Sequence, residues 1–123
     1  MATLGDIMAT DLIVVGPTAT VAEAATMMGQ RSAGSALVME GDELIGIFTE
    51  RDVVRALGQQ FDAAGHSVSE WMTANPMTVA PEMPVGDALR TMLDRGFRHL
   101  PVARGGKVVG IVSIRDLSAA TEG

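Results

Sequence analysis

Two short stretches of the chain combine a hydroxyl, an arginine and an aspartate in the same order. They read GIFTERD at 46–52 and GIVSIRD at 110–116. In the first stretch, Thr49 stands three residues before Asp52, which is the spacing of a helix capping box. Taken alone, this spacing favours a structural role at the start of a helix.

Three features of the same stretches favour a ligand instead. Aspartate is shorter than the Glu or Gln that best reaches back to the N-cap amide. Gly46 and Gly110 interrupt apolar strands, where glycine weakens the strand unless something approaches it closely. An arginine precedes the aspartate in both copies, as Arg51 and Arg115.

These residue types fit the parts of a nucleotide. A helix N-terminus with a Thr or Ser hydroxyl suits a phosphate, and a neighbouring arginine adds positive charge for its oxygens. A carboxylate one turn into the helix can accept both hydroxyls of a ribose diol. The apolar strand with its glycine notch can face a flat base. The stretches therefore predict a site for a nucleoside phosphate.

The two stretches belong to a longer internal repeat. Sliding the sequence by 64 positions aligns residues 3–57 with 67–121 without a gap. Pro17 then meets Pro81, and Met28 meets Met92. The chain is interpreted as a tandem duplication, with repeat 1 at 1–57, a joint at 58–67 and repeat 2 at 68–121.

Each repeat predicts the same order of elements, β-α-β-β-α. A capping turn (3–6, 67–70) precedes a short extended piece that ends near a proline (13–15, 78–79). Apolar residues at helical spacing from Val21 and Val85 then indicate amphipathic helices. Hairpins turn at 41–42 and 105–106, and a last helix follows each motif. The expected fold is α/β (α+β), with the two repeats packed sheet to sheet in pseudo-twofold symmetry and the helices outside.

Composition excludes several classes of function. The chain has 123 residues, 47% of them hydrophobic, no cysteine and two histidines, so disulfides are excluded and a zinc site lacks ligands. The net charge is −6, which argues against a nucleic-acid binder. No leader and no run of 18 apolar residues is visible, so we predict a cytoplasmic protein without a membrane partner. No Ser/His/Asp nucleophile set is visible, so neither an enzyme nor catalytic residues are expected.

The repeat resembles a known family. A β-α-β-β-α unit with G-h-h-[T/S]-x-x-D at its last strand, and with LPV before the second hairpin turn, resembles the CBS domain, whose tandem pairs form Bateman modules. The resemblance covers essentially the whole chain. It implies a regulatory module that binds adenosine nucleotides (AMP, ADP or ATP), S-adenosylmethionine or NAD between the copies. The ligand would be regulatory rather than a catalytic cofactor, and its occupancy would act on a separate, unknown protein.

The resemblance also implies roles for individual residues. In site 1, Thr49 and Arg51 would hold phosphate, Asp52 the ribose and Ile47 the base. The second copy would add four residues to this site, Met77, Phe97, Arg98 and His99. Site 2 would comprise Ile111, Ser113, Arg115 and Asp116, met by Ile13, Ala33 and Gly34. Because repeat 2 has FRHLPV where repeat 1 has AGSALV, site 1 is expected to be better supplied with phosphate donors.

Two functions stay open at this point. One is the ligand-sensing module, and the other is a non-catalytic dimerising interaction protein with vestigial sites. The presence of both Asp52 and Asp116 favours the first. A homodimer through the helices is also expected, because Val53, Val54 and Leu57 crowd the short helix after the first motif and some of them must face outward. The resemblance agrees with this expectation. His66, in the joint, is expected to be solvated.

Overall fold

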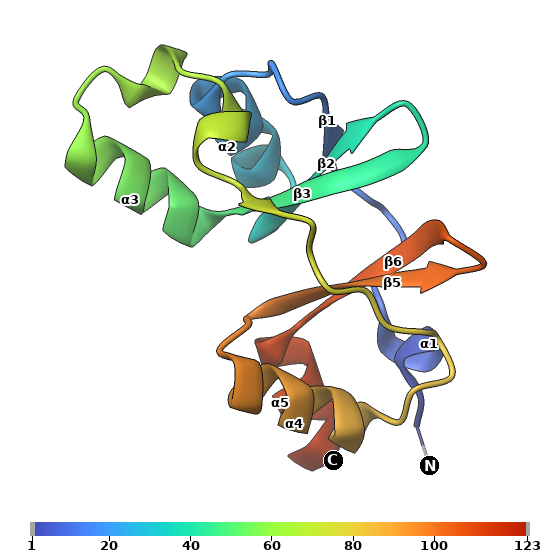
Figure 1. The fold of residues 1–123 in the computed structure, drawn as a ribbon. Coiled ribbons are helices and arrows are strands. Elements are labelled where there is room, and N and C mark those ends of the chain that lie inside the picture. Colours follow the sequence, from blue (N-terminus) through green and yellow to red (C-terminus); the bar gives the residue numbers. More distant parts are fainter. Residues whose placement is uncertain (1, 123) are drawn as a thin grey trace. The chain divides into compact units, whose positions relative to one another are not determined.

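The computed structural model describes residues 2–122, which fall into two compact units (Figure 1). The central unit is the continuous stretch Ile13–Pro76. The split unit combines the described residues of Met1–Leu12 with those of Met77–Gly123. Each unit contains strands covered by helices, so the predicted α/β fold with two related halves is confirmed.

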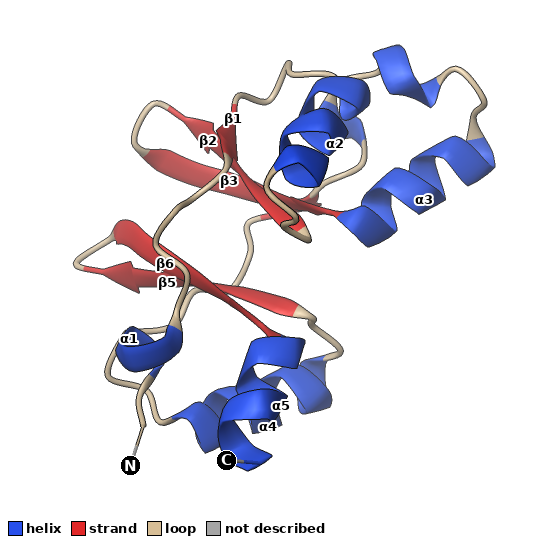
Figure 2. Cartoon of the chain, turned by 180° about the vertical axis from the view of Figure 1, so that it is seen from behind, coloured by secondary structure: helices blue, strands red, loops and turns tan. Residues whose placement is uncertain are grey.

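The central unit has one four-stranded sheet in the order β1-β2-β3-β4. The first strand is parallel to the second, and the other pairs are antiparallel. Helices α2 and α3 lie against the same sheet (Figures 1 and 2). The elements are β1 (Val14–Val15), α2 (Val21–Gln30), β2 (Ser35–Glu40), β3 (Glu43–Thr49), α3 (Glu50–Gln59), the 3-10 turns η1 (Ala63–Gly65) and η2 (Val68–Glu70), and β4 (Thr73–Ala74).

The split unit repeats this plan with shorter edges. Its strands β5 and β6 form a hairpin. A parallel bridge between Val79 and Val102, and an antiparallel bridge between Ala9 and Ile111, take the edge places that β1 and β4 hold in the central unit. The elements are α1 (Leu4–Ile7), α4 (Val85–Arg95), β5 (His99–Arg104), β6 (Lys107–Ser113) and α5 (Ile114–Glu122).

Local sequence explains where the long helices begin and end. At the start of α2, the Glu23 amide donates to the Thr20 hydroxyl at 3.0 Å in a capping box. Helix α4 ends at Gly96, whose φ of 72° is the left-handed conformation that glycine adopts most easily. Its counterpart after α2 is Ser32, with a φ of 53°. The repeat therefore keeps the same helix ending even where the glycine is absent.

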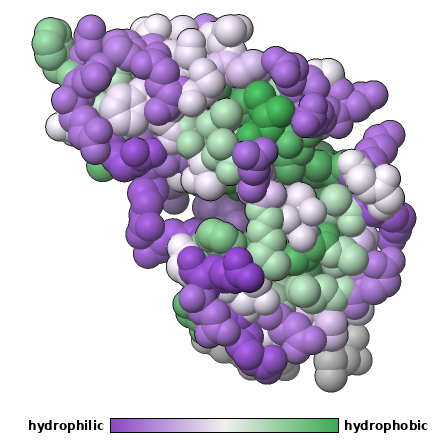
Figure 3. Space-filling model, viewed as in Figure 1, coloured by the Kyte–Doolittle hydropathy of each residue, from purple (hydrophilic) through white to green (hydrophobic). Residues whose placement is uncertain are grey.

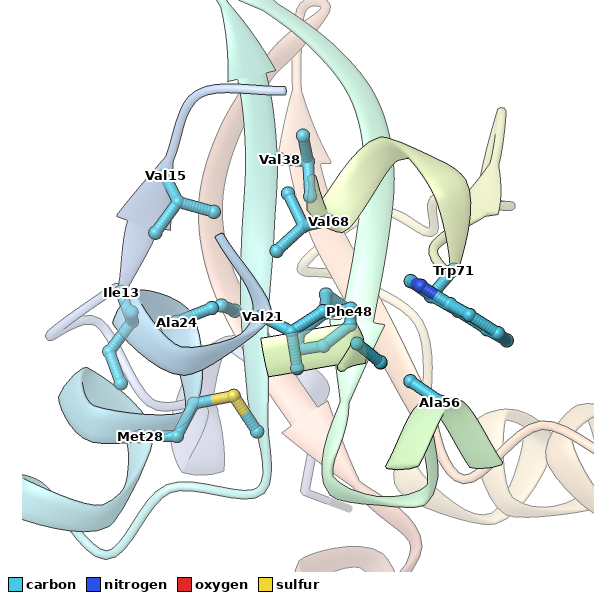
Figure 4. Packing of buried hydrophobic residues seen from close by; sticks show 12 residues of the cluster. Ile13, Val15, Val21, Ala24, Met28, Val38, Phe48, Ala56, Val68 and Trp71 are labelled. Carbon is cyan, nitrogen blue, oxygen red and sulfur yellow. The ribbon is translucent and has the colours of Figure 1, made fainter. Parts of the chain in front are cut away.

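The core of the central unit lies between its sheet and its helices. Figure 4 shows Val21, Ala24 and Met28 of α2 directed toward the strands that carry Val38 and Phe48. These side chains are at most 4% exposed, so the apolar helical spacing marks the buried face of α2 as predicted. On the face drawn in Figure 3, hydrophobic side chains gather over the β2–β3 hairpin of this unit.

The opening segment of each repeat joins the sheet of the other repeat. Thr73, from the start of repeat 2, pairs with Ile47 on β3 of repeat 1. The counterpart pairing joins Ala9 of repeat 1 to Ile111 on β6 of repeat 2. The sequence predicted these segments but not their exchange. The two compact units consequently differ from the two sequence repeats.

Capping boxes hold both opening segments in shape, as their sequences predict. The Thr3 amide donates to the Asp6 carboxylate at 2.9 Å, and the Ser67 amide donates to the Glu70 carboxylate at 3.3 Å. The hydrogen bond from the Thr3 backbone, helped by the Thr3 hydroxyl, lowers the pKa of Asp6.

The glycine notches face methionine side chains from the exchanged segments. A Cβ atom at position 46 would clash with the sulfur of Met72 and lie 3.0 Å from its Cγ. A Cβ at position 110 would lie 2.7 Å from Met8 Cγ and 3.1 Å from the Ala9 carbonyl oxygen. The sequence-based hypothesis that the notch exposes the strand to a base is therefore corrected. Gly46 and Gly110 make room for the segment that completes the sheet.

We expect Gly110→Ala to destabilise the protein by about 1–3 kcal/mol, because both a methionine and a backbone carbonyl oppose the new methyl group. Gly46→Ala should cost less, since only the flexible Met72 side chain must shift. Urea unfolding, followed by circular dichroism, measures both losses. Gly29→Ala on α2 is the control, because nothing lies within 4 Å of its new methyl group. Wild-type stability of Gly110→Ala would contradict the conclusion that this glycine makes room for the segment that contains Met8 and Ala9.

Candidate functional site

The first motif lies where β3 passes into α3. Thr49 is the N-cap residue of the helix and has extended backbone angles. Its amide donates to Oδ2 of Asp52 at 2.9 Å, and its hydroxyl donates to the same oxygen at 3.2 Å. The Asp52 amide points back at the Thr49 hydroxyl, 3.4 Å away. The capping box that the spacing predicts is therefore present.

The second oxygen of the Asp52 carboxylate is also occupied. Nη2 of Arg55 donates to Oδ1 of Asp52 at 3.1 Å, and the same nitrogen donates to the Trp71 carbonyl oxygen at 2.6 Å. The guanidinium lies over the Trp71 ring, 5.5 Å from its centroid. The Asp52 side chain is only 9% exposed, whereas that of Arg55 is 46% exposed. The carboxylate is thus connected, through Arg55, to the exchanged segment of the central unit.

The second motif has a different environment. At the junction of β6 and α5, the Asp116 amide donates to the Ser113 hydroxyl at 3.1 Å. Asp116 is exposed, whereas Asp52 is buried. Ala119 occupies the position that corresponds to Arg55, so the second motif cannot form the ion pair of the first. The two aspartates match in sequence but differ in their contacts.

Each junction is fixed by the strand that precedes the hairpin turn. In the central unit, the Glu50 amide donates to the Gly34 carbonyl at 3.0 Å. In the split unit, the Ile114 amide donates to the Arg98 carbonyl at 2.8 Å, and His99 pairs with Ser113. These bonds place the start of each hairpin beside the first residue of the following helix.

Each unit contains the motif of one predicted site and the hairpin arm of the other, where the arm is the set of predicted residues at the start of the hairpin (33–34 or 97–99). The central unit brings the Thr49–Asp52 motif together with Ala33 and Gly34, and the Ile13 carbonyl accepts from the Leu37 amide at 2.8 Å. The split unit brings the Ser113–Asp116 motif together with the 97–99 arm. Each predicted site takes its motif from one unit and its arm from the other. That grouping stays a prediction of the resemblance.

The remaining predicted residues differ in exposure. Met77 and Phe97 are half-buried and pack against the core of the split unit. Three arginines, Arg51, Arg98 and Arg115, are exposed. His66, expected to be solvated, is 29% exposed, and its ring lies 3.6 Å from Asp62 and 3.3 Å from Glu70.

Neither a metal centre nor a membrane span is found in the part of the chain that the structure describes. No group of three or more His, Cys, Asp and Glu side chains within residues 2–121 is arranged to hold a metal ion. No helix in this range is both long and apolar enough to cross a bilayer.

Sequence reasoning missed Arg55 and the role of Trp71. The signal for Arg55 was present, because an arginine three residues after Asp52 can form an ion pair on one face of a helix. Its absence from the second repeat, at Ala119, marked the same position as a difference between the copies. Nothing local in the sequence indicated that the Trp71 carbonyl would share the guanidinium.

The sequence matches the family profile of the CBS domain twice, over residues 4–59 and 68–123. The chain therefore belongs to the CBS domain family. An uncharacterised 17.7 kDa protein of Acidianus ambivalens is 42% identical over 119 residues, which cover 95% of this chain and 71% of that protein. The CBS domain-containing protein YhcV of Bacillus subtilis is 33% identical, and the match covers 96% of this chain and 84% of that protein.

Solved structures support the same family. The CBS-domain containing protein ATU1752 of Agrobacterium tumefaciens superposes with a TM-score of 0.91 at 31% identity, covering 98% of this chain and 99% of the other. The CBS domain pair of protein MJ0100, in complex with 5′-methylthioadenosine and S-adenosylmethionine, gives 0.89 at 26% identity. CBSX2, of Arabidopsis thaliana, in complex with AMP, gives 0.83 at 26% identity. Both matches cover 99% of this chain and 97% of the other.

The different surroundings of the two aspartates lead to a prediction about stability. Asp52→Asn should lower the free energy of unfolding by about 1–2 kcal/mol, because the buried carboxylate accepts charge-assisted hydrogen bonds from Thr49 and Arg55. Asp116→Asn should change it by no more than about 0.5 kcal/mol, since that side chain is exposed. Urea unfolding compares the two variants, and equal losses would contradict the assignment.

Proposed function

We propose that the chain is a regulatory module that binds an adenosine nucleotide (AMP, ADP or ATP) or a related adenosyl ligand and signals its occupancy to a separate partner protein. The observation that carries this proposal is the pair of hydroxyl-x-x-Asp junctions on a CBS fold. Two structural relatives, with TM-scores of 0.89 and 0.83, hold adenosyl ligands or AMP, which supports the same class of ligand.

In this proposal each motif reads a different part of the ligand. Asp52 and Asp116 accept the ribose hydroxyls, because a carboxylate is a strong acceptor for a diol. Thr49 and Ser113 mark the starts of α3 and α5, where the amides of the first helical turn and the side chains of Arg51 and Arg115 donate to phosphate. The apolar strand residues Ile47 and Ile111 lie two positions before these hydroxyls and contact the base.

The hairpin arms complete the proposed sites. Met77, Phe97, Arg98 and His99 supply apolar contacts and positive charge to site 1, while Ile13, Ala33 and Gly34 supply a small, uncharged wall to site 2. The vestigial alternative is less well supported, because both repeats keep the full motif, including an exposed carboxylate at Asp116. A module with abandoned sites has no need of that acid on its surface.

The choice between AMP and its 2′-deoxy form tests how the aspartates act. If a carboxylate reads the diol, 2′-deoxy-AMP should bind at least about tenfold more weakly than AMP, because one hydroxyl of the pair is missing. Isothermal titration calorimetry with both nucleotides measures the ratio. The double variant Asp52→Asn and Asp116→Asn should lose most of the discrimination.

Two results would count against the proposal in different ways. Equal affinity for AMP and 2′-deoxy-AMP would mean that the aspartates serve only as helix caps. No binding of AMP, ATP, S-adenosylmethionine or 5′-methylthioadenosine would favour the interaction protein with vestigial sites. A thermal-shift screen provides the second result independently, since a ligand that binds only the folded state raises the melting temperature.

We further propose that the protein forms a homodimer through its helices. On α3, Val54 is 73% exposed and Leu57 is 47% exposed, and these positions lie one turn apart on the same helix. Phe61, just beyond the helix, is 96% exposed. Val53, in contrast, packs against the core of the central unit. The outward apolar residues offer a surface that a second copy can bury.

A charge on that surface should separate the copies. We expect Val54→Glu to yield folded monomers, because twofold symmetry places the new carboxylate near its own counterpart. Light scattering reports the mass, and circular dichroism reports folding. Gln59→Glu adds the same charge at an exposed position of α3 and should leave the dimer intact. A monomeric wild type at micromolar concentration, with and without AMP, would exclude the homodimer.

A further inference from the structure

The carboxylates of the two motifs differ in how many hydrogen bonds they can still accept. An ionised carboxylate offers about four lone-pair positions. Asp52 already accepts from the Thr49 amide, the Thr49 hydroxyl and Arg55. About one position therefore remains, which is too few for the two hydroxyls of a ribose diol. Asp116 accepts none of the side-chain hydrogen bonds found among the described side chains of residues 2–121, so a diol can use both of its oxygens.

Of the three donors on Asp52, Arg55 is the easiest to displace. The Thr49 amide and hydroxyl belong to the capping box at the start of α3 and are fixed by the backbone of that junction. Arg55 has a flexible side chain that is 46% exposed, and its ion pair is correspondingly weak. A diol that binds Asp52 through two hydroxyls should therefore take the place of the guanidinium.

We infer that Arg55 competes with the ligand for Asp52, so that the Asp116 motif binds a ribose diol before the Asp52 motif does. This inference rests on the proposed function, because it concerns the same two motifs. The inference treats the phosphate and the ribose diol of the ligand separately. The FRHLPV arm predicted more phosphate donors for the Asp52 site, whereas the acceptor for the diol is more open at Asp116.

Displacement of Arg55 has a second effect within the central unit. The same Nη2 atom donates to Asp52 and to the Trp71 carbonyl, so a guanidinium that is displaced from the carboxylate also shifts relative to that carbonyl. Trp71 precedes Met72, which occupies the Gly46 notch, and Thr73, which pairs with Ile47. Ligand binding at Asp52 is thereby linked to the contact between Arg55 and the exchanged segment 67–74.

The test uses adenosine and 2′-deoxyadenosine, because these uncharged probes do not respond to the loss of a positive charge as a phosphate would. The protein with Arg55 and its Arg55→Met variant are compared, and both carry Asp116→Ala, so that only the Asp52 motif contributes a diol acceptor. In this background, Arg55→Met should bind adenosine about two- to fivefold more tightly than the protein with Arg55, the range expected for losing a half-exposed ion pair. Methionine retains apolar cover for the Trp71 ring. The affinity for 2′-deoxyadenosine should change by less than about twofold, because the one diol hydroxyl that it retains can use the one position that Arg55 leaves open.

The chain offers a matched variant in the other unit. Ala119→Arg places a guanidinium three residues after Asp116, on an exposed position of α5. In an Asp52→Asn background, this change should weaken adenosine binding by about two- to fivefold. Unchanged or weaker adenosine binding by Arg55→Met, in a protein that does bind adenosine, would overturn the inference. So would equal gains for adenosine and 2′-deoxyadenosine.

Hydrogen exchange separates this inference from the proposed function. The Met72 amide donates to the Val68 carbonyl at 2.8 Å, and the Asn75 amide donates to the Ile45 carbonyl at 3.0 Å. Without any ligand, Arg55→Met should speed exchange at these amides severalfold if Arg55 holds the segment. If the wild-type protein bound neither adenosine nor AMP, ATP, S-adenosylmethionine or 5′-methylthioadenosine, the proposed function would fail, while faster exchange would still support the contact. Unchanged exchange would overturn the link between Arg55 and the segment.

Discussion

A methionine packed over a glycine completes each sheet. Met72 occupies the notch at Gly46, and Met8 occupies the notch at Gly110. Each methionine belongs to a segment that also supplies an edge pairing, from Thr73 to Ile47 and from Ala9 to Ile111. A side chain at Gly110 would oppose both Met8 and the Ala9 backbone, and a side chain at Gly46 would displace the Met72 side chain from the strand that leads directly into the motif. The position of the motif therefore depends on a contact between the two sequence repeats.

This dependence explains why the same seven letters give two chemical environments. In the central unit, the exchanged segment places the Trp71 carbonyl where Arg55 can reach it, and Arg55 in turn reaches Asp52. In the split unit, the corresponding positions are Ile7 and Ala119, which provide a carbonyl but no guanidinium. The two copies share the motif, but the residue one turn further along the helix differs, and only Arg55 forms an ion pair with the carboxylate of its motif.

Much of the fold could be predicted because its signals are local. Helical spacing from Val21 and Val85, the turns at Gly41 and Gly105 and the capping boxes act within a few residues. The exchange of segments could not be predicted, because residues 3–10 (TLGDIMAT) and 67–74 (SVSEWMTA) carry the same pattern and suit either sheet. For the same reason the notch at Gly46 was assigned to a ligand rather than to Met72. The motif residues of the candidate site were visible in the sequence, but the Arg55 contact to Trp71 depends on tertiary structure.

The exchange also sets the order in which the two units can fold during synthesis. The central unit is one continuous stretch of chain, so it can form as soon as Pro76 has left the ribosome. The split unit is discontinuous, and Ala9 has no partner until Ile111 has been made. At typical elongation rates this interval lasts roughly 2–7 s, during which residues 3–9 lack their partners although the central unit can already be folded. A chain that appears symmetric by its repeats is therefore assembled asymmetrically in time, with its first residues among the last to find their place.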